Sequence, residues 1–288
     1  MSDAPHGVLV VDKPPGMTSH DVVSRVRRAF RTRAVGHAGT LDPMATGVLV
    51  VAIGEATKLV PWLTADDKSY DATLRLGTAT DSLDADGAVT ETASVPELTR
   101  DEIRDAANAF LGPHAQRAPA VSAIKVDGVR LHARARRGEV VEPPLRDVVL
   151  HEVAIRAYEA RDVELSLRCG KGFYVRSFGR DLAARLGTLG HLTALRRTAS
   201  GRFDLAASVG LDALDGAVLL SLPDAATRLL PPAILTEGAA EAARCGRRIH
   251  GVEGDEVAAL HEGKLVAVLR RDPNDPSVHR VVRGFAPV

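Results

Sequence analysis

Two short, uninterrupted apolar runs constrain the fold of this chain more than any other feature. Residues 7–11 read GVLVV, and residues 47–53 read GVLVVAI. Apolar runs of this length are typical of strands that are buried on both faces. Residues 68–76 instead alternate between apolar and polar side chains, which predicts a strand with one buried face. The apolar face of that strand consists of Tyr70, Ala72, Leu74 and Leu76.

Helix signals lie between the strand signals. Thr18 and Asp21 form a capping-box pattern at the start of a predicted helix over residues 19–30. A second pattern of this kind, at Thr99 and Glu102, predicts another helix. Strands and helices interleave without a regular βαβ rhythm. The sequence therefore predicts an α+β fold with a mixed or largely antiparallel central sheet and flanking helices.

A hairpin followed by a helix is predicted in the second half of the chain. A strand over residues 163–169 turns and returns over residues 173–176, and a helix follows over residues 177–186. Residues two apart in a strand share a face, so Tyr174 and Arg176 are expected to point the same way. An arginine beside apolar neighbours on a strand also suggests a carboxylate partner.

The composition is that of an ordinary soluble globular protein. Hydrophobic residues make up 45% of the 288 residues, and charged residues make up 26%. No apolar run approaches the ~18 residues of a membrane span, and the first ten residues lack a signal-peptide pattern, so a cytoplasmic protein without membrane association is expected. The sequence lacks the common motifs for nucleotides, nicotinamide cofactors and zinc, which predicts a reaction without cofactor or metal.

Charge is balanced overall but sorted along the chain. The 37 Lys and Arg residues equal the 37 Asp and Glu residues in number. Acidic residues are in excess over residues 62–105, whereas basic residues are in excess over 25–33, 117–146 and 168–202. Such sorting predicts a basic face and an acidic face, and the basic face would suit a polyanionic partner.

A turn-rich loop, GHAGTLDPMATG at residues 36–47, leads into the second apolar run and carries one acid, Asp42. Catalytic groups are often carried by loops that a rigid scaffold holds. By itself, however, an Asp-Pro pair is more often a turn initiator than a catalyst. The loop alone therefore leaves both interpretations open.

Four segments, in order, resemble the motifs of the TruB family of pseudouridine synthases. They are GVLVVDKPPGMTSHDVV at 7–23, GHAGTLDPMATGVLVVAIGEATK at 36–58, GKGFYVRSFGRDLAARLG at 170–187 and HLTALRRTASGRF at 191–203. The resemblance implies the pseudouridine-synthase fold and isomerisation of the uridine at position 55, in the T loop of tRNA. It implies that Asp42 is the catalytic nucleophile, acting on a flipped-out nucleotide. An aspartate could attack the base, attack the sugar or remove a sugar proton, and the sequence leaves these routes open.

The resemblance also implies roles for residues around Asp42. Tyr70 would stack on the target base, and His37 would fill the gap left by flipped-out bases. Arg176 would pair with Asp42, and Lys13 would support the catalytic loop. The residues implied to bind substrate are His37, Tyr70, Tyr174 and Leu195. The arginines implied to reach phosphates are Arg196 and Arg197.

Two domains are predicted, a catalytic domain over residues 1–229 and a short PUA-like RNA-binding β domain over residues 230–288, joined near Pro231-Pro232. Residues 117–146 are predicted to project from the first domain and to grip the T stem-loop of tRNA. A monomer is expected.

Three other functions deserve comparison with a stand-alone tRNA enzyme. One is the catalytic subunit of a guide-RNA particle, which the lack of basic extensions in this sequence disfavours. Another is a tRNA-folding chaperone whose isomerase activity is incidental. The third is an Asp-dependent hydrolase on an unrelated fold, which would need a metal or a second acid that the Asp42 loop does not offer.

Overall fold

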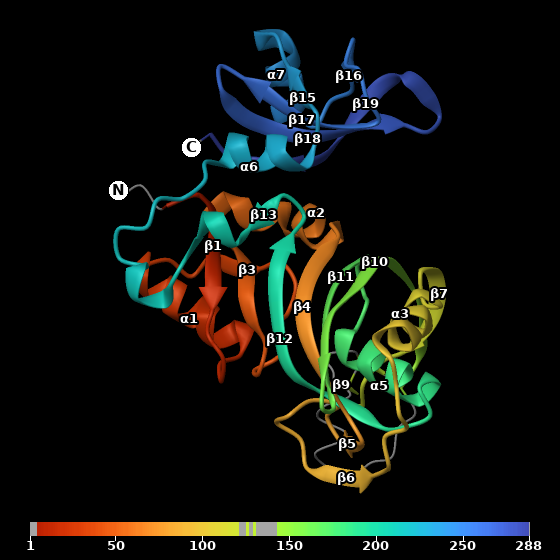
Figure 1. The fold of residues 1–288 in the computed structure, drawn as a ribbon. Coiled ribbons are helices and arrows are strands. Elements are labelled where there is room, and N and C mark those ends of the chain that lie inside the picture. Colours follow the sequence, from red (N-terminus) through yellow and green to blue (C-terminus); the bar gives the residue numbers. More distant parts are fainter. Residues whose placement is uncertain (1–4, 121–124, 127–128, 131–142, 288) are drawn as a thin grey trace.

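A computed structural model describes residues 5–120, 125–126, 129–130 and 143–287 of this chain. Figure 1 shows a large sheet in the middle of the molecule and a smaller sheet, drawn in blue, above it. None of the helices in the described ranges has the length and apolarity that crossing a bilayer would need.

The large sheet has ten strands of mixed direction, which confirms the predicted α+β fold with a mixed central sheet. Its main path runs through β14 (Ser208–Val209), β1 (Gly7–Lys13), β3 (Thr46–Ile53), β12 (Gly190–Ser200), β4 (Lys68–Leu76), β11 (Asp162–Cys169), β10 (Leu145–Glu159) and β7 (Gly112–Arg117). Two short strands join its sides, β2 (Val35–His37) beside β3 and β13 (Phe203–Asp204) beside β12. The pairs β1–β14 and β3–β12 are parallel, and the other pairs are antiparallel.

Three helices cover one face of this sheet. They are α1 (Ser19–Ala29), α3 (Arg100–Asn108) and α5 (Val175–Arg185). Both predicted capping boxes are confirmed, Thr18 with Asp21 and Thr99 with Glu102. Apolar side chains of the helices and the sheet form what we call the helix-side core. Its members include Val26, Leu49, Leu74, Ile103 and Phe178.

The opposite face of the sheet is covered at the end formed by β1 and β3. The elements that cover it are η1 (Gly54–Leu59), α2 (Val60–Ala65), α6 (Leu222–Leu229) and the smaller sheet. After β3 the chain thus forms a 3₁₀ turn followed by an α-helical turn. We call the apolar cluster on this face the second core. Its members include Val48, Val50, Leu63, Ala226, Leu260 and Phe285.

This covering explains the two sequence patterns. Along β3, Leu49 and Val51 enter the helix-side core, while Val48 and Val50 enter the second core. Both faces of β3 must therefore be apolar, which gives an uninterrupted run. Along β4 the apolar set enters the helix-side core, and Arg75 of the other face is exposed, which gives alternation.

The predicted strand over residues 173–176 is wrong. Tyr174 has an extended backbone, but it is the N-cap residue of α5, and Val175 and Arg176 already lie in the first turn of that helix. Tyr174 and Arg176 therefore do not share a strand face. The sequence pattern misses this earlier start of α5. Val175, Arg176 and Ser177 are all buried, so the first turn of the helix gives no amphipathic signal.

The smaller sheet contains five strands, all from the C-terminal part of the chain. They are, in spatial order, β15 (Pro232–Ile234), β17 (Glu256–His261), β18 (Lys264–Asp272), β19 (Asp275–Gly284) and β16 (Ile249–His250). The helix beside this sheet is α7 (Glu237–Arg244). β19 was not predicted from the sequence. The predicted domain boundary at residue 229 falls between α6 and β15, and α6 packs against both sheets through the second core.

The remaining elements are short. They are the hairpin of β5 (Thr78–Thr80) and β6 (Val89–Thr92), the paired strands β8 (Lys125–Val126) and β9 (Val129–Arg130), and the turns η2 (Leu205–Ala207) and η3 (Leu211–Ala213). β8 and β9 pair in antiparallel fashion, and residues 127–128 between them lie outside the described residues. Most of the predicted gripping segment, residues 117–146, also lies outside them.

Candidate active site

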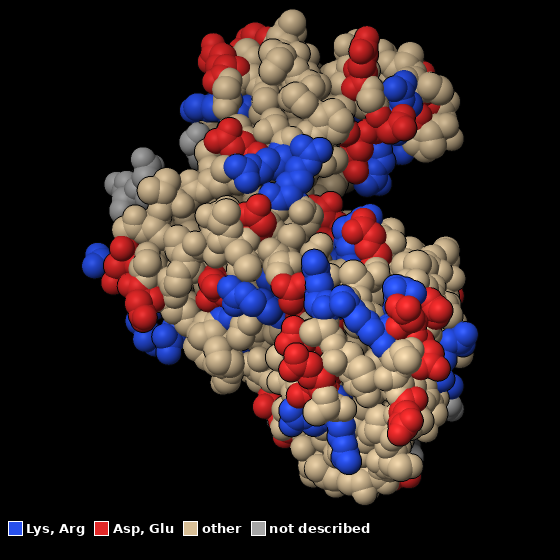
Figure 2. Space-filling view, viewed as in Figure 1, with Lys and Arg blue, Asp and Glu red and all other residues tan. Residues whose placement is uncertain are grey.

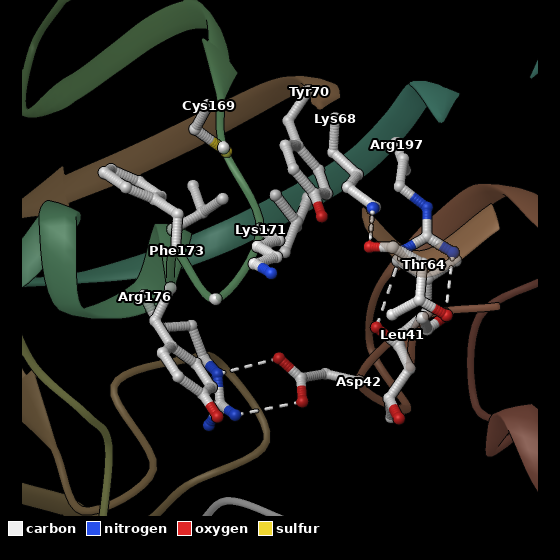
Figure 3. Close-up of a pocket in the computed structure, with 17 residues that line it drawn as sticks. Leu41, Asp42, Thr64, Lys68, Tyr70, Cys169, Lys171, Phe173, Arg176 and Arg197 are labelled. Carbon is white, nitrogen blue, oxygen red and sulfur yellow. Dashed lines mark hydrogen bonds and ion pairs between the residues drawn. The ribbon is translucent and has the colours of Figure 1, made fainter. Parts of the chain in front are cut away.

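A pocket of about 250 Å³ opens where the loop that carries Asp42, β4 and the start of α5 meet (Figure 3). Its walls come from segments that are far apart in the sequence. They include Leu41, Asp42, Lys68, Tyr70, Tyr174, Arg176, Leu195 and Arg197. Five predicted site residues thus meet at one pocket, namely Asp42, Tyr70, Tyr174, Arg176 and Leu195, whereas His37 and Lys13 lie outside its lining.

Asp42 and Arg176 form a two-point ion pair inside this pocket. Arg176 Nε lies 2.8 Å from Asp42 Oδ2, and the Nη2 of the same guanidinium donates a hydrogen bond of 2.9 Å to Asp42 Oδ1. The Arg176 side chain is 5% exposed and that of Asp42 is 31% exposed. This fork geometry fixes the direction of the carboxylate as well as its charge. Figure 3 shows the two side chains facing each other across the pocket mouth.

A second carboxylate, Asp84, contacts the same arginine. Arg176 Nη1 lies 3.2 Å from Asp84 Oδ2 and donates a hydrogen bond of 2.6 Å to the carbonyl oxygen of Ser82. Asp84 is buried and lies in the segment between β5 and β6. Sequence reasoning missed it, because nothing in the local pattern DSLDADG separates this aspartate from its exposed neighbours.

Opposing effects act on the protonation of Asp42. Burial is the largest and raises the pKa of its carboxyl group above the ordinary value of 3.8. The charge and hydrogen bond of Arg176 lower this pKa, and the nearby charge of Asp84 raises it. The net direction is upward. Arg176 therefore favours the anion that a nucleophile needs, while the pocket itself disfavours it.

The backbone of the Asp42 loop is held from several sides. The Ser19 hydroxyl accepts a hydrogen bond of 2.9 Å from Leu41 N, and Lys13 Nζ donates one of 3.2 Å to Pro43 O. Gly47, at φ +99°, lets β3 approach β12, because a Cβ there would lie 2.2 Å from Arg197 O. The loop is thus fixed before any substrate arrives, as catalysis by positioning requires.

Lys13 is fully buried below this loop. Its ammonium group also donates to the carbonyl oxygens of Pro14, at 2.9 Å, and Met17, at 2.7 Å. Burial lowers the pKa of Lys13 to about 8. These contacts fit the support role that the sequence resemblance implies for Lys13.

The prediction that Arg197 reaches phosphates is wrong. Its side chain is 1% exposed and donates to the carbonyl oxygens of Val48, at 2.6 Å, and Gly39, at 3.1 Å. Arg197 faces Tyr70 on the neighbouring strand and also lines the pocket. The Arg197 guanidinium therefore holds the loop that carries Asp42 by hydrogen bonds to backbone carbonyl oxygens. Long chain separation hides such backbone contacts from sequence reasoning.

Tyr70 presents its ring to the pocket from β4. Burial raises the pKa of its phenol, although the charge of Arg197 lowers it. The neutral phenol is therefore favoured, and it is available for stacking and as a hydrogen-bond donor. Leu195, on the adjacent strand β12, adds an apolar wall.

His37 ends β2, five residues before Asp42. Its ring lies edge-on to His20 with centroids 5.5 Å apart, and burial lowers its pKa. Arg196 is half-exposed and pairs with Asp12 at 2.8 Å. Figure 2 shows basic and acidic side chains intermixed on the face turned to the viewer, so the predicted separation into faces is weaker there than the segment charges suggested.

The described residues contain no group of three or more His, Cys, Asp or Glu side chains that could hold a metal ion.

Comparison with known proteins gives a consistent result. Residues 27–175 match the family model described as TruB family pseudouridylate synthase, N-terminal domain. Residues 176–235 match the model described as tRNA pseudouridylate synthase B C-terminal domain. The tRNA pseudouridine synthase B of Mycobacterium sp. (strain KMS) is 48% identical over 275 residues, which cover 93% of each chain. The enzyme of the same name from Corynebacterium aurimucosum is 47% identical, with 92% of each chain covered.

Solved structures share the fold. A chain of a Cbf5–Nop10–Gar1 complex superposes with a TM-score of 0.76 and 26% identity, covering 98% of this chain and 85% of that one. A chain of an H/ACA ribonucleoprotein bound to a substrate RNA gives a TM-score of 0.74 and 24% identity, with 98% and 86% covered.

Proposed function

Because the chain belongs to the TruB family of pseudouridylate synthases, we propose that it isomerises a uridine of tRNA to pseudouridine with Asp42 as the nucleophile. The observation that carries this proposal is the fixed pair of Asp42 and Arg176 in a pocket with an aromatic wall. The proposed target is the uridine at position 55 in the T loop.

In the proposed reaction the uridine enters the pocket and its ring stacks on Tyr70. The carboxylate of Asp42, aimed by Arg176, assists cleavage of the bond between N1 of uracil and C1′ of the ribose. The freed base turns within the pocket and rejoins C1′ through C5. The C5 proton is then lost and N1 takes up a proton, so the product is an isomer of the substrate. Tyr174 and Leu195 would confine the base during this rotation. Whether the carboxylate attacks base or sugar, or takes a sugar proton, is left open by this geometry.

The tRNA enzyme is favoured over the guide-RNA particle subunit. The relatives named tRNA pseudouridine synthase B are 47–48% identical over more than nine-tenths of the chain, whereas the protein of the Cbf5 complex is 26% identical. A hydrolase on an unrelated fold is not supported, because the fold is that of pseudouridine synthases. A chaperone activity beside the isomerase would depend on RNA binding and not on Asp42.

The remaining parts of the proposal concern the RNA partner and the segments of this chain that hold it. We propose that residues 117–146 and the PUA-like C-terminal β domain hold the T stem-loop while the target nucleotide flips into the pocket. The proposed working form is a cytoplasmic monomer without a cofactor.

The decisive experiment is the Asp42→Asn variant. The amide keeps the volume of the side chain but cannot act as an anionic nucleophile, so isomerisation should fall by roughly 10⁴-fold or more. The measurement is tritium release from tRNA labelled at C5 of uridine, with thermal melts alongside. Asp162→Asn is a matched control, since Asp162 forms a similar two-point pair with Arg75 at the surface, at 2.8 and 2.6 Å. Release by Asp42→Asn at the parental rate would refute the assignment.

A further inference from the structure

Gln116 makes an unusual pair of contacts close to the pocket. It lies on β7, is 2% exposed, and uses both ends of its carboxamide on a single distant residue. Gln116 Nε2 donates to Tyr174 O at 3.1 Å, and Tyr174 N donates to Gln116 Oε1 at 2.8 Å. The side chain thus satisfies both backbone groups of Tyr174, as a neighbouring strand would.

The residue held in this way is the one that sets the start of α5. Tyr174 is the N-cap, and a tyrosine side chain cannot accept hydrogen bonds from the first helical turn as Ser, Thr, Asp or Asn does. Its extended backbone, φ −112° and ψ 109°, must therefore be fixed from elsewhere. The Gln116 carboxamide supplies two directional bonds for this purpose.

Arg176 follows Tyr174 by two residues, within the first turn of the same helix. A small rotation of this helical turn would shift the Arg176 guanidinium relative to the Asp42 carboxylate. The two contacts between these groups are 2.8 and 2.9 Å long. Gln116 itself does not line the pocket. Any influence of Gln116 on the reaction must therefore pass through Tyr174, either to its own side chain at the pocket or along the backbone to Arg176.

We propose that Gln116 is a positioning residue of the isomerase site, which fixes the start of α5 so that Arg176 aims the carboxylate of Asp42. This inference rests on the proposed function and deepens it. It adds a residue that follows from no feature of the local sequence, because 58 positions separate the two partners.

The first test is Gln116→Met, which keeps most of the volume and removes both hydrogen bonds. The single-turnover rate of pseudouridine formation, at saturating unmodified tRNA transcript, should fall roughly 10- to 100-fold, the scale expected for a misplacement of about 1 Å. The affinity for tRNA, measured by filter binding, should stay that of the parent. If Gln116→Met does not fold, Gln116→Glu replaces it, because it keeps the acceptor for Tyr174 N but sets a carboxylate against Tyr174 O.

Thr188→Val is the matched control. Thr188 follows the C-terminal end of α5, is 6% exposed, and donates a hydrogen bond of 2.8 Å to Ser94 O. Its loss should lower the melting temperature to a similar extent and leave the single-turnover rate unchanged. A residue with a merely structural role at position 116 would behave as Thr188 does.

The second test asks whether Gln116 acts through Arg176. In an Arg176→Lys background, which already lacks the fork, Gln116→Met should lower the single-turnover rate by a much smaller factor than it does in the parent. Equal costs in both backgrounds, or an unchanged rate in the single variant, would overturn the inference while leaving the isomerase function intact. A parent protein that forms no pseudouridine would instead refute the proposed function itself.

Discussion

The two halves of the central sheet differ in how they are covered. β1 and β3 lie between two cores, and the residues of β3 from Gly47 to Ile53 are buried. β4 and β11 meet the helix-side core with one face, and their other face carries exposed or half-buried polar groups such as Asp71 and Glu164. We refer to these as the doubly covered half and the open half.

The difference separates two tasks. The doubly covered half carries the loop of Asp42, and burial on both sides holds that loop through Lys13 and the backbone of β3. The open half contributes Tyr70 at the pocket and leaves a polar surface beside it. A rigidly held carboxylate and an accessible pocket wall can thus coexist in one sheet. The ion pair of Arg176 with Asp42 connects α5 to the loop that the doubly covered half carries.

The largest effect should come from removing the ion pair between Arg176 and Asp42. Arg176→Ala would leave Asp84 buried without its arginine and Asp42 without its fork, which should lower the free energy of unfolding by about 3–5 kcal/mol and abolish activity. Adding Asp42→Asn removes one of the two carboxylates, so the double variant should be more stable than Arg176→Ala alone. Urea denaturation of both variants measures this. A double variant less stable than the single one would contradict the electrostatic account.

The halves should also differ in tolerance to truncation. Leu49→Ala, in the fully buried strand β3, should lower the free energy of unfolding by about 2–5 kcal/mol. Thr73→Ala, on the open face of β4, should change it by no more than about 1 kcal/mol. Chemical denaturation of the two variants gives the comparison. Similar losses at both positions would show that the open half is covered in solution.

The pH dependence of stability and activity tests the charges that act on Asp42. The pKa of Asp42 is raised, so the folded protein binds this proton more tightly than the unfolded chain, and Asp42 favours folding increasingly as pH falls toward 3.8. Activity needs the anion and should therefore decline on the acid side at a pH above that of an ordinary aspartate. Asp84→Asn removes a charge that raises this pKa, so the acid limb of the single-turnover rate should move to lower pH. A limb that stays in place would exclude coupling between the two carboxylates.

The smallest effect is expected at the surface, where Arg196 of β12 reaches Asp12 of β1 across β3. Arg196 and Asp12 form a half-exposed pair, so Arg196→Gln should change the free energy of unfolding by less than about 1 kcal/mol. Arg28 on α1 is exposed and belongs to the arginine-rich segment 25–33. If that segment contacts RNA, Arg28→Gln should reduce the slope of log affinity against log salt by roughly 0.7–0.9, and Arg196→Gln should do the same if Arg196 reaches a phosphate, as the family resemblance implies. Equal slopes for both variants and the parent would place the RNA elsewhere.

Local patterns predicted much of the fold. The capping boxes at Thr18 and Thr99 fixed two helix starts, because each box satisfies backbone donors with side chains three residues away. The uninterrupted run of β3 and the alternation of β4 indicated how many faces each strand buries. The start of α5 was missed, since its first turn is buried all round and gives no periodic signal.

The site divides in the same way. The sequence by itself, through the loop motif and its resemblance to a family, determined Asp42 as the candidate nucleophile and named Tyr70 and Arg176 as its companions. Only the tertiary structure decided that Asp84 shares Arg176, that Arg197 is buried on backbone carbonyls, and that Gln116 holds Tyr174. Caps and periodic faces depend on residues a few positions apart, so they are written locally in the chain. The contacts that aim Asp42 join segments tens to more than a hundred residues apart, and the packing of the whole sheet brings them together.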